Sequence, residues 1–168
     1  GIIGKSGCGK TTLLSVMVGF LRPNRGRVYY RGKDLFKSGK AVEGRFGFSS
    51  QETSFYDKLT VEENLSYFGK MYGLKRKIVN DRAEALIRLF ELESAADTTG
   101  GELSSGMQKR LDIACALIHD PEVLFLDEPT ANLDPLLRKD IIKLIKKIKG
   151  FGTTVVITSH ILGEIDYL

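Results

Sequence analysis

The chain has 168 residues, of which 42% are hydrophobic and 27% are charged, and its formal net charge is +4 at pH 7. These are the values of an ordinary globular domain, so they exclude an intrinsically disordered chain, and the two cysteines are too few for a disulfide framework. No apolar run approaches the roughly 20 residues of a membrane-spanning helix, and the lysines and arginines are too dispersed to indicate a nucleic-acid-binding face.

Short β-like runs alternate with helical runs along the chain, a pattern that predicts an α/β fold with a mainly parallel sheet. Thr60 and Glu63 have the spacing of a capping box at the start of a helix that Gly73 would close. Residues 56–97 contain only helical patterns, so we expect them to form a lobe beside the sheet. In chain order we expect strands at residues 1–3, 27–30, 45–49, 123–126 and 153–158, and helices at 11–21, 60–72, 77–93, 107–118 and 136–149.

A lysine-rich segment near the end of the chain has a clear helical period. Apolar residues recur at positions 141, 144, 145 and 148, and lysines occupy the opposite side. This spacing predicts an amphipathic helix with a solvated face, which we favour over a nucleic-acid or membrane-surface role.

Glycine accounts for 18 residues, more than its average share of about 7%, and several of them lie in one loop. Gly4-Lys5-Ser6-Gly7-Cys8-Gly9-Lys10-Thr11 matches the P-loop pattern G-x-x-x-x-G-K-[ST] between a predicted strand and a predicted helix. In such a loop, backbone N–H groups hold the β-phosphate of a nucleotide, Lys10 reaches the β- and γ-phosphates, and the Thr11 hydroxyl ligates Mg²⁺. We interpret Cys8 as a small loop residue without a redox role.

Two consecutive acids, Asp127 and Glu128, follow four apolar residues at 123–126. A buried strand would carry both acids to its C-terminal edge, which is where open α/β sheets bind ligands. Asp127 is placed there to hold Mg²⁺ through water, and Glu128 to polarise an attacking water as general base. Adjacent acids at a strand end can also be merely solvated, but the P-loop upstream favours the functional interpretation.

With further motifs in a fixed order, these segments resemble the nucleotide-binding domain of ABC (ATP-binding cassette) ATPases over essentially the whole chain. Taken singly, Gln51 would pass for a loop residue, Ser104 for an N-cap and His160 for a strand-end histidine, but the ordered set leaves that interpretation little room. The motifs are the P-loop at 4–12, the Q-loop glutamine Gln51, the signature motif at 103–110, the Walker B end at 127–130, the D-loop at 131–134 and the switch histidine His160.

The resemblance implies a P-loop NTPase fold of the α/β class, with a mainly parallel sheet flanked by helices and an inserted all-helical signature subdomain. A RecA-like core would comprise residues 1–55 and 111–168, and the helical subdomain residues 56–110. The implied site residues are Glu128, His160 and Gln51 for catalysis; Gly4, Ser6, Gly7, Cys8, Gly9, Lys10, Thr11, Thr12, Ser104, Gly106 and Asp134 for ATP; and Thr11, Gln51 and Asp127 for Mg²⁺.

Each motif has a role in that family. Ser104 and Gly106 would bind the γ-phosphate of ATP held by the opposite subunit, so two chains would sandwich two nucleotides. Asp134 would position groups across the dimer interface, and His160 would contact the γ-phosphate from its own side. Gln51 would contact Mg²⁺ and the attacking water and would sense a transmembrane partner.

The amino-acid sequences of the segments 59–65, 72–74 and 106–114 look most like those of prokaryotic exporter-type cassettes of the ABC-2 or multidrug kind. The resemblance therefore implies an ATPase subunit that works as a homodimer or as a heterodimer with another ABC ATPase subunit. Its partners would be transmembrane permease subunits rather than nucleic acid, at the cytoplasmic face of the cell membrane. Relative to the family, we expect the sequence to be truncated at both ends and to lack the aromatic residue that stacks on adenine.

Two alternatives remain open at the level of the sequence. The first is a soluble ABC-type ATPase that acts on ribosomes or DNA. The second is a low-activity regulatory cassette, because Ser105 and Met107 replace a glycine and a glutamine of the usual Leu-Ser-Gly-Gly-Gln signature. A GTPase or small-molecule kinase is disfavoured, because the printed sequence has no Asn-Lys-x-Asp guanine motif and a signature motif would be unexplained.

Overall fold

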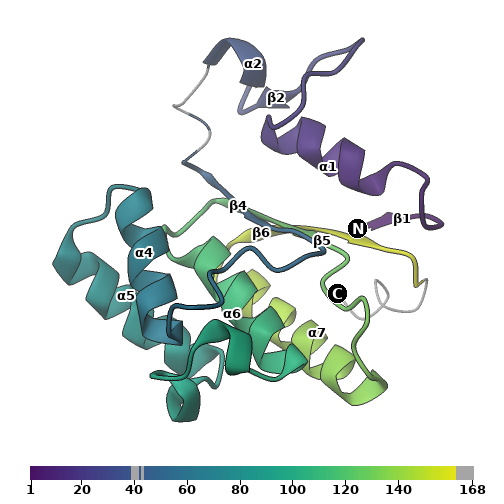
Figure 1. The fold of residues 1–168 in the computed structure, drawn as a ribbon. Helices are drawn as coiled ribbons and strands as arrows, with labels where there is room; N and C mark the ends of the chain where they lie inside the picture. Colours follow the sequence, from purple (N-terminus) through teal and green to yellow (C-terminus); the bar gives the residue numbers. More distant parts are fainter. Residues whose placement is uncertain (39–41, 43, 162–168) are drawn as a thin grey trace.

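The computed structural model describes residues 1–38, 42 and 44–161. Among these residues, four strands form a parallel sheet in the order β1-β6-β5-β4 (Figure 1). The register places Ser49 opposite Leu126 and Asp127 opposite Thr158, so the C-terminal ends of the strands lie at one edge. This arrangement confirms the predicted α/β fold. The strands are β1 (Ile2–Ile3), β4 (Phe46–Ser49), β5 (Val123–Asp127) and β6 (Thr154–Ser159).

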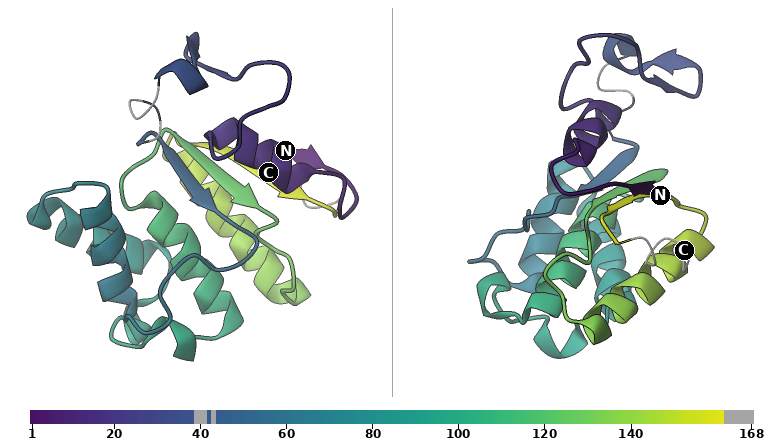
Figure 2. Two further views of the ribbon diagram at one scale, coloured as in Figure 1. Left: turned by 45° about the horizontal axis from the view of Figure 1, so that its top comes forward. Right: turned by 90° about the vertical axis from the view of Figure 1, so that its right-hand side faces the viewer.

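Helices cover both faces of the sheet (Figure 1, Figure 2). Phe125 of β5 packs in the core beside α1, whereas Leu124 and Leu126 pack in the core beside α6 and α7. A strand buried on both faces has no polar side, which explains its continuously apolar sequence. None of the described helices combines the length and hydropathy that a membrane span requires. One face carries α1 (Lys10–Val18), and the other carries α4 (Val61–Met71), α5 (Arg76–Leu89), α6 (Ser105–Leu117) and α7 (Pro135–Gly150).

A small hairpin lies apart from the parallel sheet. Its strands are β2 (Tyr29–Tyr30) and β3 (Lys33–Asp34), which pair antiparallel and lead into the short helix α2 (Leu35–Ser38). Between them, Arg31 and Gly32 have φ of 48° and 75°, the positive values that a two-residue type I′ turn requires. The strand predicted at 27–30 is therefore shorter than expected, and β3 was missed because two polar residues carry no periodic signal.

Two helices, α1 and α5, end well before their predicted C-terminal ends. The first helix stops at Val18 because Gly19 adopts a φ of 92°, which closes the helix before the expected end at 21. Helix α5 ends at Leu89, where Glu91 with a φ of 54° takes the chain out of helical geometry. The capping box of Thr60 and Glu63 is present as predicted. Two short 3-10 turns, Glu93–Ala95 and Gly100–Glu102, lie between α5 and α6.

The helical segment is packed tightly onto the sheet. Helix α4 packs on α5 and α6, and α6 lies directly on β4. A Cβ at Gly47 would stand 2.3 Å from the Ala116 carbonyl oxygen, so only glycine permits this approach. One hydrophobic core runs from Leu65 in α4 through Leu111 in α6 to Leu124 in β5. The proposed boundary between residues 110 and 111 falls inside α6, and the division into subdomains stays a prediction.

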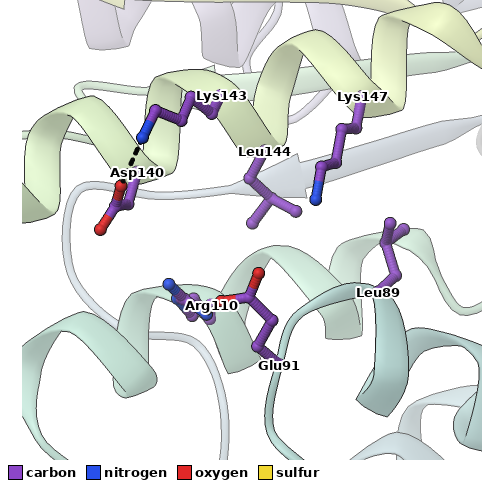
Figure 3. Close-up of a pocket in the computed structure, with 7 residues that line it drawn as sticks. All are labelled: Leu89, Glu91, Arg110, Asp140, Lys143, Leu144 and Lys147. Atoms are coloured by element: carbon purple, nitrogen blue, oxygen red, sulfur yellow. Dashed lines mark hydrogen bonds and ion pairs between the residues drawn. The ribbon is translucent and has the colours of Figure 1, made fainter.

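Helix α7 has the amphipathic pattern that its sequence predicted. Its apolar residues at 141, 144, 145 and 148 are buried, and its lysines are exposed. Figure 3 shows Lys143 and Lys147 facing a shallow hollow between α7, α6 and the end of α5. Ion pairs link Lys143 to Asp140 at 3.2 Å and Arg110 to Glu91 at 2.7 Å, so basic and acidic groups offset one another there.

His119 is buried where α6 meets the sheet. Its ring stacks on Tyr72 with centroids 3.6 Å apart, and its Nε2 lies 3.0 Å from the Phe46 carbonyl oxygen. Because that oxygen can only accept a hydrogen bond, Nε2 carries the proton, and the buried Nδ1 has no hydrogen-bond partner among the described residues. Burial lowers the pKa of His119 below its ordinary value of 6.5, and the Phe46 carbonyl opposes this only in part.

The first prediction is that acid destabilises the fold through His119. In the unfolded chain His119 is protonated at its ordinary pKa of 6.5, whereas in the folded chain it is protonated only at a lower pH. The unfolded state therefore binds more protons in acid, and the free energy of unfolding decreases as the pH drops below 6.5. We expect melting temperatures of the His119→Phe variant to fall less steeply than those of the unmodified protein between about pH 7.5 and about pH 5.5. His160, the other histidine of the chain, is unchanged in the variant, so the two proteins differ only at position 119. Equal slopes would contradict the assignment.

Candidate nucleotide-binding site

The loops that follow the parallel strands meet at one edge of the sheet. β1 leads into the P-loop, β4 into Ser50 and Gln51, β5 into Glu128 and β6 into His160. Because β6 lies between β1 and β5, the loops after these three strands are neighbours. This edge of an open parallel sheet is where ligands bind in α/β folds.

The P-loop forms an open, exposed bend between β1 and α1. Gly7 and Gly9 have φ of 77° and 97°, a conformation that favours glycine, and Gly9 is the N-cap of α1. Residues 5–9 are exposed, as are Thr11 and Thr12 in the first turn of α1. Exposed backbone N–H groups at the N-terminus of this nine-residue helix suit an anion. Gly4 lies beneath Cys8, whose Sγ would be 2.6 Å from a Cβ at that position.

Lys10 is buried beneath the loop, with 6% of its surface exposed. Its Nζ donates to the carbonyl oxygens of Gly4 at 2.7 Å and Lys5 at 3.0 Å. The same ammonium lies 3.0 Å from Glu128 Oε1, an ion pair whose two side chains are 5% and 12% exposed. Lys10 therefore joins the P-loop to the end of β5.

Glu128 stands between two basic groups. Its Oε1 pairs with Lys10, and its Oε2 lies 2.6 Å from His160 Nδ1. Partial burial alone would raise the pKa of this carboxyl, but the hydrogen bonds from Lys10 and His160 outweigh burial and hold the pKa below its ordinary value. Its backbone φ of 46° turns the chain out of β5, so the side chain points to the P-loop rather than along the sheet.

Asp127 occupies a different environment from its neighbour. It is fully buried, and its Oδ1 accepts a hydrogen bond of 2.6 Å from the Thr158 hydroxyl. The same hydroxyl oxygen accepts from the Glu128 backbone N–H at 2.9 Å. The second carboxylate oxygen, Oδ2, is buried without a hydrogen-bond partner among the described residues. A carboxylate held at one oxygen and open at the other fits a magnesium-water shell.

The other predicted site residues lie apart from this cluster. Gln51 is exposed in the loop after β4. Ser104 is the N-cap of α6, where its hydroxyl accepts from Met107 N at 3.4 Å, and Asp134 is the N-cap of α7. Gly106 is buried, and a Cβ there would stand 2.9 Å from Leu137 Cδ2. Within the described part of the chain, no hydrogen bond or ion pair joins these four residues to the P-loop, and their roles toward a nucleotide stay predictions.

Sequence reasoning missed Thr158, which orients both acids. A signal was present, because Thr158 and Ser159 are polar residues that directly follow the apolar run 155–157 at the end of the strand. The hydroxyl of Thr158 meets Asp127 only because β5 and β6 pair in parallel with these two residues opposite each other.

Comparison with known proteins places this geometry in a family. The family model described as ABC transporter matches residues 1–131. The solved structure of cbiO1 from Clostridium perfringens, part of the ABC transporter complex cbiONQ, superposes with a TM-score of 0.85 and 30% identity, covering 95% of this chain and 66% of that one. The chain therefore belongs to the ABC transporter family, with the P-loop NTPase fold and a nucleotide-binding site.

Curated relatives are ATP-binding proteins of the same kind. NatA, an ABC transporter ATP-binding protein of Bacillus subtilis, is 37% identical over 169 residues, which cover 100% of this chain and 69% of NatA. The probable multidrug ABC transporter ATP-binding protein YbhF of Escherichia coli is 38% identical over 99% of this chain. The chain spans 29% of YbhF and 53% of the daunorubicin resistance protein DrrA3 of Streptomyces coeruleorubidus, to which it is 39% identical.

The second prediction concerns the Thr158 hydroxyl. Thr158→Val preserves the side-chain volume but removes the hydrogen bond that orients the Asp127 carboxylate. Magnesium should raise the affinity for ATP in the unmodified protein, and we expect this increase to be about ten-fold smaller in the variant. A titration with a fluorescent ATP analogue, with and without MgCl₂, measures this gain. Thr154→Val, at the exposed opposite end of β6, is the matched control. An equal loss in both variants would contradict the role given to Thr158.

Proposed function

We propose that this chain is the ATP-binding and hydrolysing part of an ABC transporter and that it powers translocation by a membrane permease. The observation that carries the proposal is the clamp on Glu128, which Lys10 and His160 hold from two sides at the edge of the sheet. A carboxylate beside the phosphate-binding lysine is placed to accept a proton from water attacking the γ-phosphate.

The proposed chemistry is an in-line displacement. The oxygen of water bonds to the γ-phosphorus, the bond from that phosphorus to the β,γ-bridging oxygen breaks, and ADP leaves with the bond's electron pair. Glu128 takes the proton of the attacking water, and His160 orients the water and contacts the γ-phosphate. Lys10 offsets the charge on the transferring phosphoryl group. When phosphate enters, the Lys10 ammonium exchanges its contact with Glu128 for one with phosphate, which releases the carboxylate.

Magnesium fits the same edge of the site. Asp127 offers Oδ2, which has no hydrogen-bond partner among the described residues; the Thr11 hydroxyl is exposed in the first turn of α1, and Gln51 is exposed in the loop after β4. The bound ion would neutralise charge on the β- and γ-phosphates. Thr158 keeps Asp127 directed toward that position.

We further propose that two such subunits, identical or different, complete two sites together. Ser104 at the start of α6 and Asp134 at the start of α7 are both exposed, so a second chain can reach them. Their separation from the P-loop in one chain supports a role toward the nucleotide of a partner. In this arrangement residues 56–110 carry the signature motif and residues 1–55 and 111–168 carry the catalytic core.

The names of the relatives favour export. YbhF is named a probable multidrug ABC transporter ATP-binding protein, and DrrA3 is named a daunorubicin resistance ATP-binding protein. We therefore propose that the permease partner exports its substrate, with this chain bound at the cytoplasmic face of the membrane and no nucleic acid involved.

The third prediction tests the role of Glu128. In the full-length protein, Glu128→Gln should lower the rate of phosphate release at least about 100-fold, because the amide cannot accept the proton, while ATP still binds. Glu122→Gln is the matched control: Glu122 precedes the same strand at its opposite end, where it pairs with Arg31 and Arg45. Undiminished turnover in the Glu128 variant would overturn the proposal.

A further inference from the structure

A buried ion pair lies where α6 packs on β4. Lys109 and Asp112 are 6% and 2% exposed, and Lys109 Nζ lies 3.3 Å from Asp112 Oδ2. Both residues belong to α6, the helix that begins after Ser104. Buried charges require partners, and these two find their remaining partners outside their own helix.

Those partners are the two ends of the loop that carries Gln51. Lys109 Nζ donates to the Ser50 carbonyl oxygen at 2.8 Å, immediately before Gln51. Asp112 Oδ1 accepts from the Ser54 backbone N–H at 2.8 Å, three residues after Gln51. Each charged side chain therefore holds one end of the segment 50–54 by a charge-assisted hydrogen bond.

The same pair also holds the end of β4. The Ser49 hydroxyl donates to Asp112 Oδ2 at 2.5 Å and lies 3.3 Å from Lys109 Nζ. Ser49 is fully buried, so its hydroxyl depends on these partners. The loop thus begins at a strand end and returns to the helix, with both attachments on one helical turn of α6.

The loop also closes on itself. The Ser50 hydroxyl donates to the Glu52 carbonyl oxygen at 2.5 Å and lies 3.0 Å from the Ser54 hydroxyl. Gln51 is exposed between these contacts. A small closed loop moves as a unit with whatever holds its ends, and here α6 holds both of them.

Packing stability alone does not account for this cluster. Gly47 already lets α6 lie against β4 through its backbone, with no help from charged groups. A buried ion pair contributes little net stability compared with apolar side chains of the same volume, although removal of one partner leaves a costly lone charge. The hydrogen bonds to the loop are what an apolar pair could not supply.

We propose that Lys109 and Asp112 are positioning residues that attach the Gln51 loop to helix α6. Rigid secondary elements and the hydrogen bonds attached to them transmit displacements, so a displacement of α6 that follows contact at Ser104 displaces Gln51 as well. This inference rests on the proposed function, in which Ser104 contacts the nucleotide of a partner subunit and Gln51 contacts magnesium and the attacking water.

The fourth prediction is a local loosening of the loop. The double variant Lys109→Met, Asp112→Leu removes both attachments without leaving a lone buried charge. In the full-length protein we expect amide hydrogen exchange in 50–54 to accelerate about ten-fold or more, with little change in the hydrophobic core. Arg82→Met is the matched control, because Arg82 also contacts the end of α6, through the Ile118 carbonyl oxygen and Asp120, but not the loop.

A kinetic cycle then tests whether the pair acts through Gln51. The double variant should lower kcat about ten- to 100-fold with the KM for ATP nearly unchanged, because the loop is misplaced rather than the P-loop. In a Gln51→Ala background the same double variant should lower kcat little further, whereas a purely structural defect would add to the loss. If the double variant does not fold, Lys109→Gln with Asp112→Asn replaces it; the amides turn the charge-assisted hydrogen bonds to the loop into weaker neutral ones, so the same effects are expected with smaller size.

The outcomes separate this inference from the proposed function. Unchanged exchange in 50–54, or kcat losses that add to that of Gln51→Ala, would overturn the positioning role. A full-length protein without ATP turnover would overturn the proposed function and, with it, the coupling to Gln51 chemistry. The exchange measurement would still decide whether α6 holds the loop.

Discussion

The placement of β6 between β1 and β5 is the constraint on which the site depends. It sets the P-loop, His160 and Glu128 side by side at one sheet edge, and the ion pair of Glu128 with Lys10 and the contact with His160 follow from that order. The pairing of Asp127 with Thr158 follows from the same register. A shift of β6 by one residue would turn Thr158 to the other face of the sheet, away from Asp127.

Asp127 and Glu128 are adjacent in the sequence but lie in different environments, because the backbone leaves the strand at Glu128. Asp127 ends the strand and is buried; one of its oxygens accepts a hydrogen bond from Thr158, and the other has no partner among the residues that the structure describes. Glu128 takes a positive φ, leaves the sheet and faces two basic groups that lower its pKa. The two neighbouring acids thus differ in their surroundings rather than in the chemistry of their carboxyl groups.

Helix α6 links most of the remaining site. It starts at Ser104, approaches α7 closely at Gly106, and carries Lys109 and Asp112 beneath the Gln51 loop. The sequence alone predicted the family motif at 103–110, but it did not predict the contacts of Lys109 and Asp112 with the Gln51 loop. The motif is a local string of residue types, whereas Lys109 and Asp112 gain meaning only from Ser50 and Ser54, about 60 residues earlier in the chain.

The sequence by itself determined the P-loop, the two acids, the capping box and the alternation of strands and helices, because each depends on neighbours within a few residues. It also indicated the family through the order of its motifs. The tertiary structure decided the strand order, the orientation of Asp127 by Thr158, the clamp on Glu128 and the attachment of the Gln51 loop to α6. These features depend on pairings between distant segments, and local propensity carries no information about which distant residue will stand opposite.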